Sequence, residues 1–579
     1  MNKLDLIIRN GQLFDGTGDD RIKGDIGILD GVIVQLGGSI ESDAKAVMDA
    51  TGHWVMPGFI DFHTHYDAEL EIDPSLSESV RHGVTSVVVG SCSLSTAVGE
   101  PEDIADIFCR VEGVPRSTML PLLEKIKTWT TFEDYLEHLA ERPLGPNVSA
   151  FVGHSNLRMN VMGFARSLDH KIRPTQSELK EMKRQLERAL DAGYLGLSIQ
   201  TLPWDKLDGD RFRSRPLPSY YARWSEYRQL TRILRRRKRV FQGVPNITTK
   251  VNVLLFLWES VGLFRPALRT TVISLMDIIA NRSIYRVVPW LSRFFNRLLG
   301  ADFRFQALPN PFDVWADGME LVIFEEFASG TEAIHLNNLA QRAELLQDPE
   351  YIKRFRRHWK SLFSPRVYHR NLKHTEILDC PDKTLIGRSF FDIAKSQGQD
   401  PVAVFLNLAS QHGERLRWYS MVANDRLKPL ERIVSHPDVL IGFSDAGAHL
   451  RNMAHYSFPL RMLKLVRDAE LRGEGFMSIE RAVHRLTGEI ADWFRLPNGH
   501  LKVGQQADLV VVNPDGLNTK LDETYEIEMP GFSGLKRLVR RSDDAVPLVV
   551  INGKTAWEKG ALSADLGKKP GFGRVLKPI

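Results

Sequence analysis

The sequence predicts an α/β protein: a (β/α)8 TIM barrel with a small β-sandwich domain built from both ends of the chain. Along the middle of the chain, apolar strand-like runs alternate with amphipathic helical stretches, which is typical of a parallel sheet. Both ends consist of short β-rich runs and turns. The predicted division is 1–57 and 496–579 for the sandwich and 58–495 for the barrel, with a helical insertion at about 310–435.

The β-rich character of the two ends comes from short apolar runs with turn residues between them. The N-terminal runs are Leu6–Gly11, Asp25–Gly31 and Val32–Leu36, and the C-terminal runs are Ala507–Val512 and Leu548–Gly553. Asn10-Gly11 and Asp30-Gly31 predict hairpin turns, because both residue pairs tolerate the positive φ angles of such turns. We therefore expect one small sheet domain assembled from both termini.

Eight strand-like runs in the middle of the chain account for the predicted barrel. They are Phe59–His63, Thr85–Gly90, Val148–Gly153, Gly196–Gln200, Val240–Val244, Thr271–Leu275, Phe303–Leu308 and Val439–Phe443. Helices intervene, and Gln176–Ala192 carries apolar residues at helical spacing. In such a barrel the chemistry collects on loops after the carboxyl ends of the strands. The long gap before the eighth strand predicts a helical cap over the pocket.

Composition restricts the location and the partners. The net charge of the 579 residues is +4, which does not predict nucleic-acid binding. The cysteines Cys92, Cys109 and Cys380 have no paired spacing, which favours a reducing compartment. The N-terminus lacks the pattern of a signal peptide, and no apolar run reaches membrane-spanning length. We therefore expect a cytoplasmic protein with a small-molecule substrate.

Two basic segments each have more than one interpretation. The run Arg235–Arg239 is expected to be the solvated C-terminal end of a helix, where cations suit the helix dipole. Residues 251–299 are apolar and contain several arginines, as an interfacial membrane helix would. We favour barrel helices packed on the sheet, or a subunit interface that would make a homo-oligomer, over membrane association.

His63 and His65 are the most informative residues. They end an apolar run that enters through Pro57-Gly58, and Asp67 follows them. Side chains alternate along a strand, so the two imidazoles point the same way. Two imidazoles at the carboxyl end of a strand are typical of half a divalent-metal site. The sequence therefore predicts a hydrolase.

Three further residues follow predicted strands at the same edge. Cys92 follows the second strand, where a metal would hold it as thiolate, although a lone cysteine is usually buried filler. His154 follows the third strand and has three open roles: a metal ligand, a substrate contact or a partner of buried backbone. Asp445 follows the eighth strand and is predicted to act as general base, with a helix N-cap as the alternative.

The sequence resembles the amidohydrolase superfamily, and within it the N-acyl-D-amino-acid deacylase (D-aminoacylase) branch. The resemblance rests on Asn10-Gly11 with Asp15–Gly18, Pro57–His65, His82–Cys92, Val152–His154, Ile441–Asp445, Leu486–Ala491 and Gly504–Asp508. It implies a β-sandwich with a (β/α)8 barrel, hydrolysis of an amide bond, and one or two zinc ions or another divalent metal. Cys92 stands where this branch has its metal-binding cysteine.

The chain departs from the family pattern after the fifth and sixth strands. The deacylases have a metal-binding histidine in each place, whereas this chain offers Gln242, Asn246 and Asp277 as substitutes. The expected ligand set is therefore His63, His65, Cys92 and Asp445 around a single metal, and a weakened or absent site stays open.

The predicted function is hydrolysis of the amide bond of a small N-acyl amino acid, with an N-acyl-D-amino acid as one option. Metal-activated water would attack, and Asp445 would serve as general base. Arg215 and Arg158 are candidates to bind the substrate carboxylate, because a guanidinium matches a carboxylate with two hydrogen bonds. The alternatives are hydrolysis of a cyclic amide or lactone, and a metal-free barrel that serves as a binding or scaffold protein.

Overall fold

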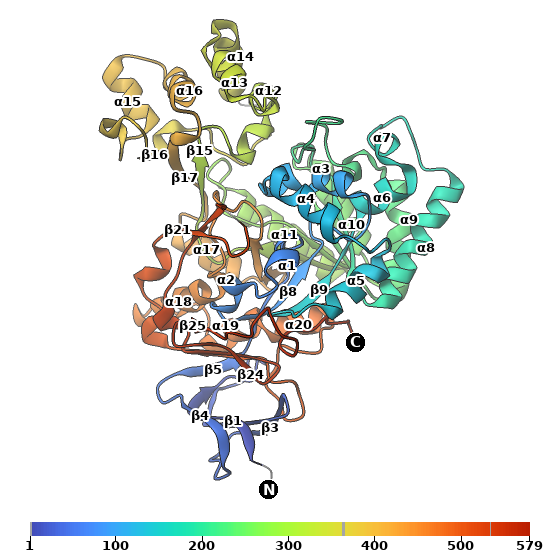
Figure 1. The fold of residues 1–579 in the computed structure, drawn as a ribbon, viewed down its shortest axis with the longest axis vertical. Coiled ribbons are helices and arrows are strands. Elements are labelled where there is room, and N and C mark those ends of the chain that lie inside the picture. Colours follow the sequence, from blue (N-terminus) through green and yellow to red (C-terminus); the bar gives the residue numbers. More distant parts are fainter. Residues whose placement is uncertain (1–2, 362–364, 533) are drawn as a thin grey trace.

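The computed structural model describes residues 3–361, 365–532 and 534–579 of the chain (Figure 1). Residues 1 and 2, at the start of the N-terminal segment in which no signal-peptide pattern is present, lie outside the described residues. No helix among the described residues is long and apolar enough to cross a membrane.

All eight strands predicted for the middle of the chain are present, and three of them are interrupted by one residue. The first is β6 (Phe59–Asp61) with β7 (His63–Thr64), the third β9 (Asn147–Ala150) with β10 (Val152–Gly153), and the eighth β18 (Val439–Ile441) with β19 (Phe443–Ala446). The others are β8 (Val84–Val89), β11 (Gly196–Gln200), β12 (Val240–Val244), β13 (Arg269–Val272) and β14 (Asp302–Ala307).

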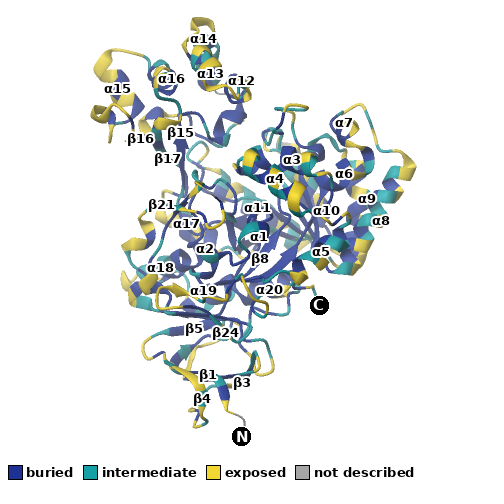
Figure 2. Ribbon diagram, in the orientation of Figure 1, coloured by how far each residue is buried: buried dark blue, intermediate teal, exposed yellow. Residues whose placement is uncertain are grey.

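These strands are hydrogen-bonded in parallel in three sheets. Their orders are β6-β8-β9, β10-β11-β12-β13-β14-β18 and β19-β7. Figure 2 shows these strands buried at the centre of the molecule, with helices whose outer faces are exposed around them. Parallel strands covered by helices define the α/β class, so that part of the prediction is confirmed.

The helices alternate with the strands along the chain. Helix α8 has the predicted bounds, Gln176–Ala192, because Thr175 and Glu178 form a capping box at its start. Helix α9 (Trp224–Arg237) ends in the predicted arginine run. The others outside the insertion are α1 (Glu69–Ile72), α2 (Ser77–Val80), α3 (Pro101–Glu112), α4 (Arg116–Ile126), α5 (Phe132–Glu141), α6 (His154–Met162), α7 (Phe164–Ser167), α10 (Lys250–Ser260), α11 (Ile284–Leu298), α17 (Leu427–Val434), α18 (Phe458–Leu471), α19 (Ile479–Leu486) and α20 (Gly488–Phe494).

Strands from both ends of the chain share one nine-stranded sheet, in the order β25-β24-β23-β20-β5-β1-β2-β3, with β4 paired to β1. Its members are β1 (Leu4–Leu13), β2 (Ile22–Leu29), β3 (Val32–Leu36), β4 (Ala44–Asp49), β5 (Trp54–Pro57), β20 (Leu509–Val512), β23 (Leu548–Ile551), β24 (Lys554–Glu558) and β25 (Ala561–Leu562). A separate hairpin pairs β21 (Tyr525–Glu528) with β22 (Lys536–Val539).

One of the two predicted turns of this sheet is wrong. Asp30-Gly31 does connect β2 to β3, with φ angles of 50° and 81°. Asn10-Gly11 instead lies inside β1, where the register with β2 shifts between Ile8 and Gly11. Asn10 has φ 61°, and its backbone N–H donates to Asp25 Oδ1 at 2.9 Å, so the positive φ serves a bulge rather than a turn.

The segment between β14 and α17 folds around its own apolar cluster, which includes Phe324, Phe405 and Trp418. It contains α12 (Ala328–His335), α13 (Leu339–Gln347), α14 (Pro349–Trp359), α15 (Phe390–Gln397) and α16 (Pro401–His412). It also has an antiparallel sheet of β15 (Phe312–Asp317), β17 (Arg417–Ala423) and β16 (Thr375–Asp379), so it is more than a helical cap. In Figure 1 it stands out from the central strands.

Candidate metal centre

His63 and His65 point to the same side of β7, as predicted from strand alternation. The two ring centroids are 5.4 Å apart. Thr64 between them faces the other way, and its hydroxyl donates to Val88 O at 2.8 Å. Burial lowers the pKa of His63 to about 4 and the pKa of His65 to about 3, so both rings are neutral at pH 7. Neutral imidazole is the form that binds a metal.

Cys92 joins the two histidines from the end of β8. Its Sγ lies 3.2 Å from His63 Nε2, and donor atoms of His63, His65 and Cys92 all lie within 4.8 Å of one another. Cys92 adopts a left-handed backbone with φ 53°. Its N–H donates to Gln242 Oε1 at 3.3 Å, which helps to hold this turn. A non-glycine residue in this conformation costs free energy, so the surrounding contacts have to hold it there.

Asp445 faces both imidazoles from the eighth strand. Its Oδ1 lies 3.4 Å from His63 Nε2 and 3.5 Å from His65 Nε2. Pairing of β19 with β7 holds this position, and the N–H of His65 donates to Ala446 O at 2.8 Å. Gly447 has to be glycine, because a Cβ there would lie 2.6 Å from His65 O. Burial raises the pKa of Asp445, while His63 and His449 oppose this shift.

Two acceptors behind the histidines were missed by the sequence analysis. His63 Nδ1 lies 2.5 Å from Oε1 of Gln306 on β14, and His65 Nδ1 lies 3.1 Å from Oε1 of Glu112 at the end of α3. The hydrogen bond to Gln306 fixes the tautomer of His63 with the proton on Nδ1 and leaves Nε2 free to bind a cation. Glu112 faces Nδ1 of His65 without forming a hydrogen bond to it. No motif marks these residues, because only tertiary packing brings them behind the rings.

The charges around the cluster favour a bound cation. Burial, and then the carboxylates of Asp445, Asp205 and Asp67, raise the pKa of Glu112 well above its usual value. Burial also raises the pKa of Asp67 and of Asp205 to about 7. A divalent cation would stabilise the ionised form of such a group of carboxylates. With two imidazole nitrogens and a sulfur beside them, the donor set fits a divalent metal such as zinc.

Asp205 is a further residue that the sequence analysis did not select. It lies in the loop after β11, in which an arginine was selected instead as a candidate to bind the substrate carboxylate. Among the arginines of this loop, Arg211 pairs with Asp106 and Asp103, each at 2.8 Å, and Arg213 pairs with Asp208 at 2.5 Å. Arg215 is exposed, and its guanidinium lies over the ring of Phe212.

The three proposed substitutes for the missing histidines lie in different surroundings. Gln242 contacts the cluster through the N–H of Cys92, as described above. Asn246 instead accepts from the backbone N–H of Thr248 at 2.9 Å. Asp277 is buried between two arginines, 2.9 Å from Arg282 and 2.7 Å from Arg426. The structure therefore brings Gln242 to the cluster and gives Asn246 and Asp277 other partners.

His154 and Arg158 belong to a separate buried network. His154 Nε2 lies 3.2 Å from Glu226 Oε1, and its Nδ1 lies 3.1 Å from Ser219 Oγ. The guanidinium of Arg158 also pairs with Glu226 and donates to Ser167 O. Glu226 thus neutralises Arg158 inside the fold, which corrects the expectation that Arg158 is free to bind a substrate carboxylate.

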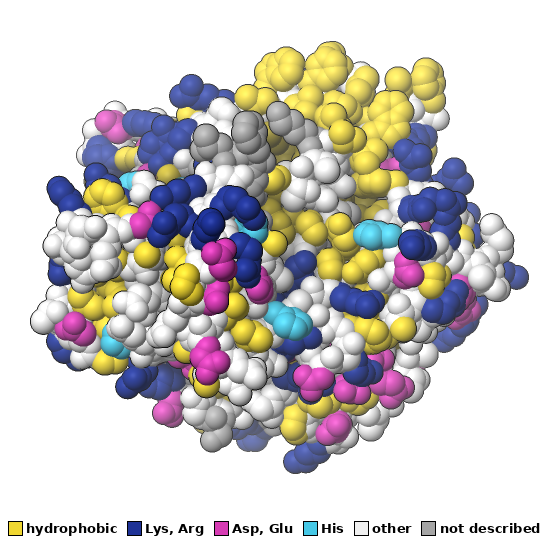
Figure 3. Space-filling model, turned by 90° about the horizontal axis from the view of Figure 1, so that it is seen from above, with side chains coloured by type: hydrophobic (Ala, Val, Ile, Leu, Met, Phe, Trp, Pro, Cys, Tyr) yellow, Lys and Arg dark blue, Asp and Glu magenta, His cyan; other side chains and the backbone are white. Residues whose placement is uncertain are grey.

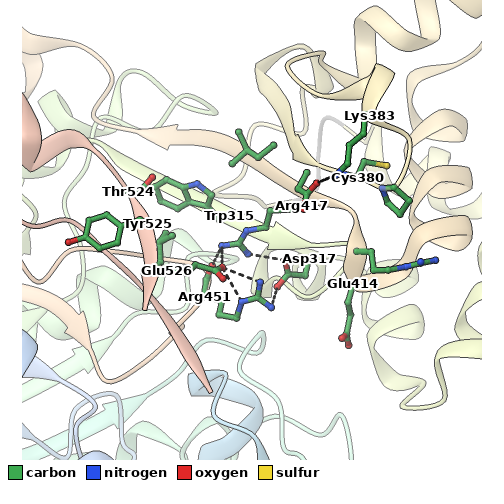
Figure 4. A pocket seen from close by; sticks show the side chains of 15 residues that line it. Trp315, Asp317, Cys380, Lys383, Glu414, Arg417, Arg451, Thr524, Tyr525 and Glu526 are labelled. Carbon is green, nitrogen blue, oxygen red and sulfur yellow. Dashed lines mark hydrogen bonds and ion pairs between the residues drawn. The ribbon is translucent and has the colours of Figure 1, made fainter. Parts of the chain in front are cut away.

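A cavity of about 500 Å³ lies away from these histidines, between the insertion and the β21–β22 hairpin (Figure 4). Its walls carry Arg417 and Arg451, both paired with Asp317 at 3.0 and 2.9 Å. Both also pair with Glu526, at 3.2 and 3.1 Å. None of the predicted site residues lines this cavity.

With parallel strands, covering helices and converging donors in place, the chain is similar to the amidohydrolases. The model of the Amidohydrolase family matches residues 350–556. A protein of Mycobacterium tuberculosis (strain ATCC 25618 / H37Rv) is 45% identical over 579 residues, covering 99% of this chain and 94% of that protein. The N-acyl-D-aspartate deacylase of Alcaligenes xylosoxydans xylosoxydans is 36% identical over 197 residues, which are 34% of this chain and 36% of the deacylase.

Solved structures of the same fold include two deacylases. The N-acyl-D-glutamate deacylase from Bordetella bronchiseptica, complexed with zinc and a phosphonate inhibitor, has a TM-score of 0.65 and 23% identity, and the match covers 100% of both chains. A crystal structure of D-aminoacylase has a TM-score of 0.64 and 21% identity, covering 99% of this chain and 100% of that one. The predicted resemblance to the amidohydrolases, and with it the hydrolase class, is confirmed.

Proposed function

We propose that this chain is a divalent-metal-dependent amidohydrolase that hydrolyses the amide bond of a small N-acyl amino acid. One observation carries the proposal: His63 and His65 come from the end of one strand and Cys92 from the turn after the next, and their donor atoms converge within 4.8 Å. The partial matches to N-acyl-D-aspartate and N-acyl-D-glutamate deacylases, 36% and 37% identical, support the substrate class.

The proposed ligands are His63 Nε2, His65 Nε2, Cys92 Sγ and an oxygen of Asp445, around one zinc ion. Nitrogen and sulfur donors together favour zinc over magnesium or calcium. A bound zinc ion would lower the pKa of a water molecule and polarise the amide carbonyl. A second ion has weaker support, because Gln242 stands on β12 where the resemblance to the deacylases implies a histidine, and Asp277 is paired with arginines.

The residues of the chain would perform the proton transfers. Asp445 accepts a proton from the attacking water and then donates it to the leaving nitrogen as the carbon–nitrogen bond breaks. Gln306 and Glu112 keep the imidazoles of His63 and His65 oriented. Arg215 stays our candidate to bind the substrate carboxylate, since no acidic partner of its guanidinium is found among the described residues.

We further propose that the three parallel sheets form one closed (β/α)8 barrel. Each strand pairs with the next in order, and β19 pairs back to β7. The N–H of Phe62, between β6 and β7, donates to Gly442 O at 2.8 Å, which bridges the junction. The division into 1–57, 58–495 and 496–579 with an insertion at about 310–435 agrees with the shared terminal sheet and with the separate apolar cluster. A cytoplasmic location is proposed from the three free cysteines.

Metal analysis combined with substrate comparison tests the proposed function. We expect one zinc per purified chain and faster hydrolysis of N-acyl amino acids, in one stereochemical series, than of cyclic amides or lactones. Preference for the cyclic substrates would replace the deacylase assignment with the first alternative. Less than a tenth of an equivalent of metal after supplementation, together with no hydrolysis, would favour a binding or scaffold protein.

A further inference from the structure

Helices α10 and α11 expose an unusual set of large apolar side chains. Phe264 in the loop after α10 is 97% exposed, Trp290 on α11 is 68% exposed and Trp258 on α10 is 53% exposed. We call this surface the α10–α11 face; its exposed members are Val251, Leu254, Trp258, Leu263, Phe264, Val287, Trp290, Phe294 and Leu298. Figure 3 shows a broad hydrophobic area at the upper edge of its view, with Lys and Arg side chains at its borders.

The face is built by the geometry of both helices. On α11, Val287, Trp290, Phe294 and Leu298 follow at steps of three or four residues, so they share one side of the helix. The opposite side holds the buried Tyr285. The rings of Trp290 and Phe294 are stacked with centroids 6.2 Å apart. Helix α11 therefore carries large apolar residues on its exposed side as well as on its buried side.

The two helices contribute to one continuous surface. The N–H of Gly262, just before the exposed Leu263 and Phe264, donates to Leu299 O at the end of α11 at 3.2 Å. On α10, Val251, Leu254 and Trp258 recur at steps of three and four residues. Phe256 and Leu257 of the same helix are buried in the main core. The buried residues of α10 thus anchor the α10–α11 face on the main core, and the loop with Leu263 and Phe264 projects from it.

Within residues 250–300, the charged side chains at the surface are basic. The acidic residues of this segment are Glu259 and Asp277, which are 3% and 0% exposed. Arg265, Arg286 and Arg297 are exposed. The remaining basic residues between 250 and 300 are Lys250, Arg269, Arg282 and Arg293. The face is therefore apolar at its centre and cationic around it.

We propose that the α10–α11 face docks on the surface of an anionic lipid bilayer. Trp, Phe and Leu side chains that project from a face with arginines at its border are typical of interfacial membrane binding. Anionic headgroups complement the arginines, each of which adds to the attraction. A second copy of this chain would instead oppose like charges across the same face, which disfavours a homodimer there. Helices α10 and α11 pack on β13 and β14, as predicted from the sequence, and the proposal assigns a role to the sides of these helices that remain exposed.

The face also borders the edge of the sheet that carries the candidate site. Asn252 near the start of α10 accepts at Oδ1 from Thr201 Oγ1, which follows β11, and from the N–H of Asn246, which follows β12, each at 2.9 Å. Docking would therefore bring the carboxyl ends of these strands toward the bilayer. The docking proposal itself does not depend on the proposed hydrolysis.

Vesicle co-sedimentation of the full-length chain tests the proposal. The probes are phosphatidylcholine vesicles and vesicles that also contain phosphatidylglycerol. We expect binding to the phosphatidylglycerol vesicles, little binding to phosphatidylcholine alone, and release by high salt. Absence of binding to the anionic vesicles would overturn the proposal, and so would an equally strong binding to both kinds.

Surface variants localise the interaction. Phe264→Ser, Trp290→Ser and Arg297→Glu should each reduce vesicle partitioning by about tenfold or more. Leu471→Ser and Arg173→Glu change exposed residues outside the face and should bind as the wild type does. If the two control variants lost as much vesicle binding as the three variants of the face, the assignment to this face would be overturned. A dimer in sedimentation velocity that Trp290→Ser dissociates, without vesicle binding, would instead identify an interface between copies. Unchanged thermal midpoints would confirm that all variants are folded.

Discussion

Glu112 Oε1 lies 3.1 Å from His65 Nδ1, on the side of the ring away from Asp445. This carboxylate is 2% exposed, and it comes from the end of a helix that follows a different strand from the histidine. The two atoms form no hydrogen bond in this structure, and we expect the carboxylate to accept one from Nδ1 and to direct Nε2 toward the metal when the metal binds. Gln306 performs the same task for His63 from β14. The ring of His63 is therefore oriented before any metal binds.

Glu112→Gln should weaken metal binding by about 10- to 100-fold, because an amide oxygen orients the ring less strongly than a carboxylate. Competition with a chromophoric chelator would measure the zinc affinity independently of activity. Glu102→Gln is the matched control, since Glu102 lies on the same helix with its side chain 50% exposed. An unchanged affinity in Glu112→Gln would show that Glu112 does not position His65.

Asp445→Asn should lower kcat by about 100- to 10,000-fold, because an amide cannot accept a proton from water. The variant should retain much of its metal, because His63, His65 and Cys92 are unchanged. Steady-state kinetics and metal analysis on the same preparation would separate the two effects. Wild-type turnover in this variant would exclude Asp445 as the general base.

Cys92→Ser should remove a sulfur ligand while preserving the size of the side chain. We expect the cobalt-substituted wild type to show a thiolate-to-cobalt absorption band, and we expect the variant to lose it. Cys109→Ser is the control, since Cys109 is also buried and free but is not part of the donor cluster. A band that survives in Cys92→Ser would exclude Cys92 from the ligand set.

Asp277→Asn should destabilise the fold without changing the metal content. The carboxylate is buried and pairs with Arg282 and Arg426, whose side chains are 32% and 42% exposed. Because the arginines can turn to water, we expect a loss of about 1–3 kcal/mol in the free energy of unfolding. Urea unfolding and metal analysis would measure the two properties. Loss of metal at unchanged stability would restore Asp277 as a ligand.

The stability of the insertion should decrease between pH 7 and pH 5. Burial lowers the pKa of His369 to about 4, while its Nδ1 accepts from the N–H of Asn371 at 2.9 Å and its Nε2 lies 2.8 Å from Met421 O. The unfolded chain binds this proton near pH 6.5, so the stabilisation is complete above that pH and is lost toward pH 4.

The expected loss at pH 5 is up to about 2 kcal/mol. Thermal unfolding at both pH values would measure it, with His369→Gln as the comparison, because glutamine keeps a donor and an acceptor but does not titrate. If the variant and the wild type lose equal stability on acidification, His369 is not responsible for the pH dependence.

Local patterns were sufficient for much of the framework. The bounds of α8 follow from its capping box and apolar spacing, and the common direction of His63 and His65 follows from strand alternation. The bulge at Asn10-Gly11 was mistaken for a turn, because the same positive φ serves both structures. Composition also showed that 251–299 is apolar and contains several arginines, but it could not distinguish the buried sides of α10 and α11 from their exposed sides.

The strands, the histidine pair, Cys92 and Asp445 could be predicted from the sequence, because each belongs to a short run of neighbouring residues. The positions of Glu112 and Gln306 behind the histidines, and the pairing of Glu226 with Arg158, became visible only in the folded chain. These pairs join residues far apart in the chain, and a single acid or amide carries no local signal of the partner it will meet. Distance along the chain is the physical reason: periodicity describes neighbours, whereas contacts between separate elements depend on how the whole chain packs.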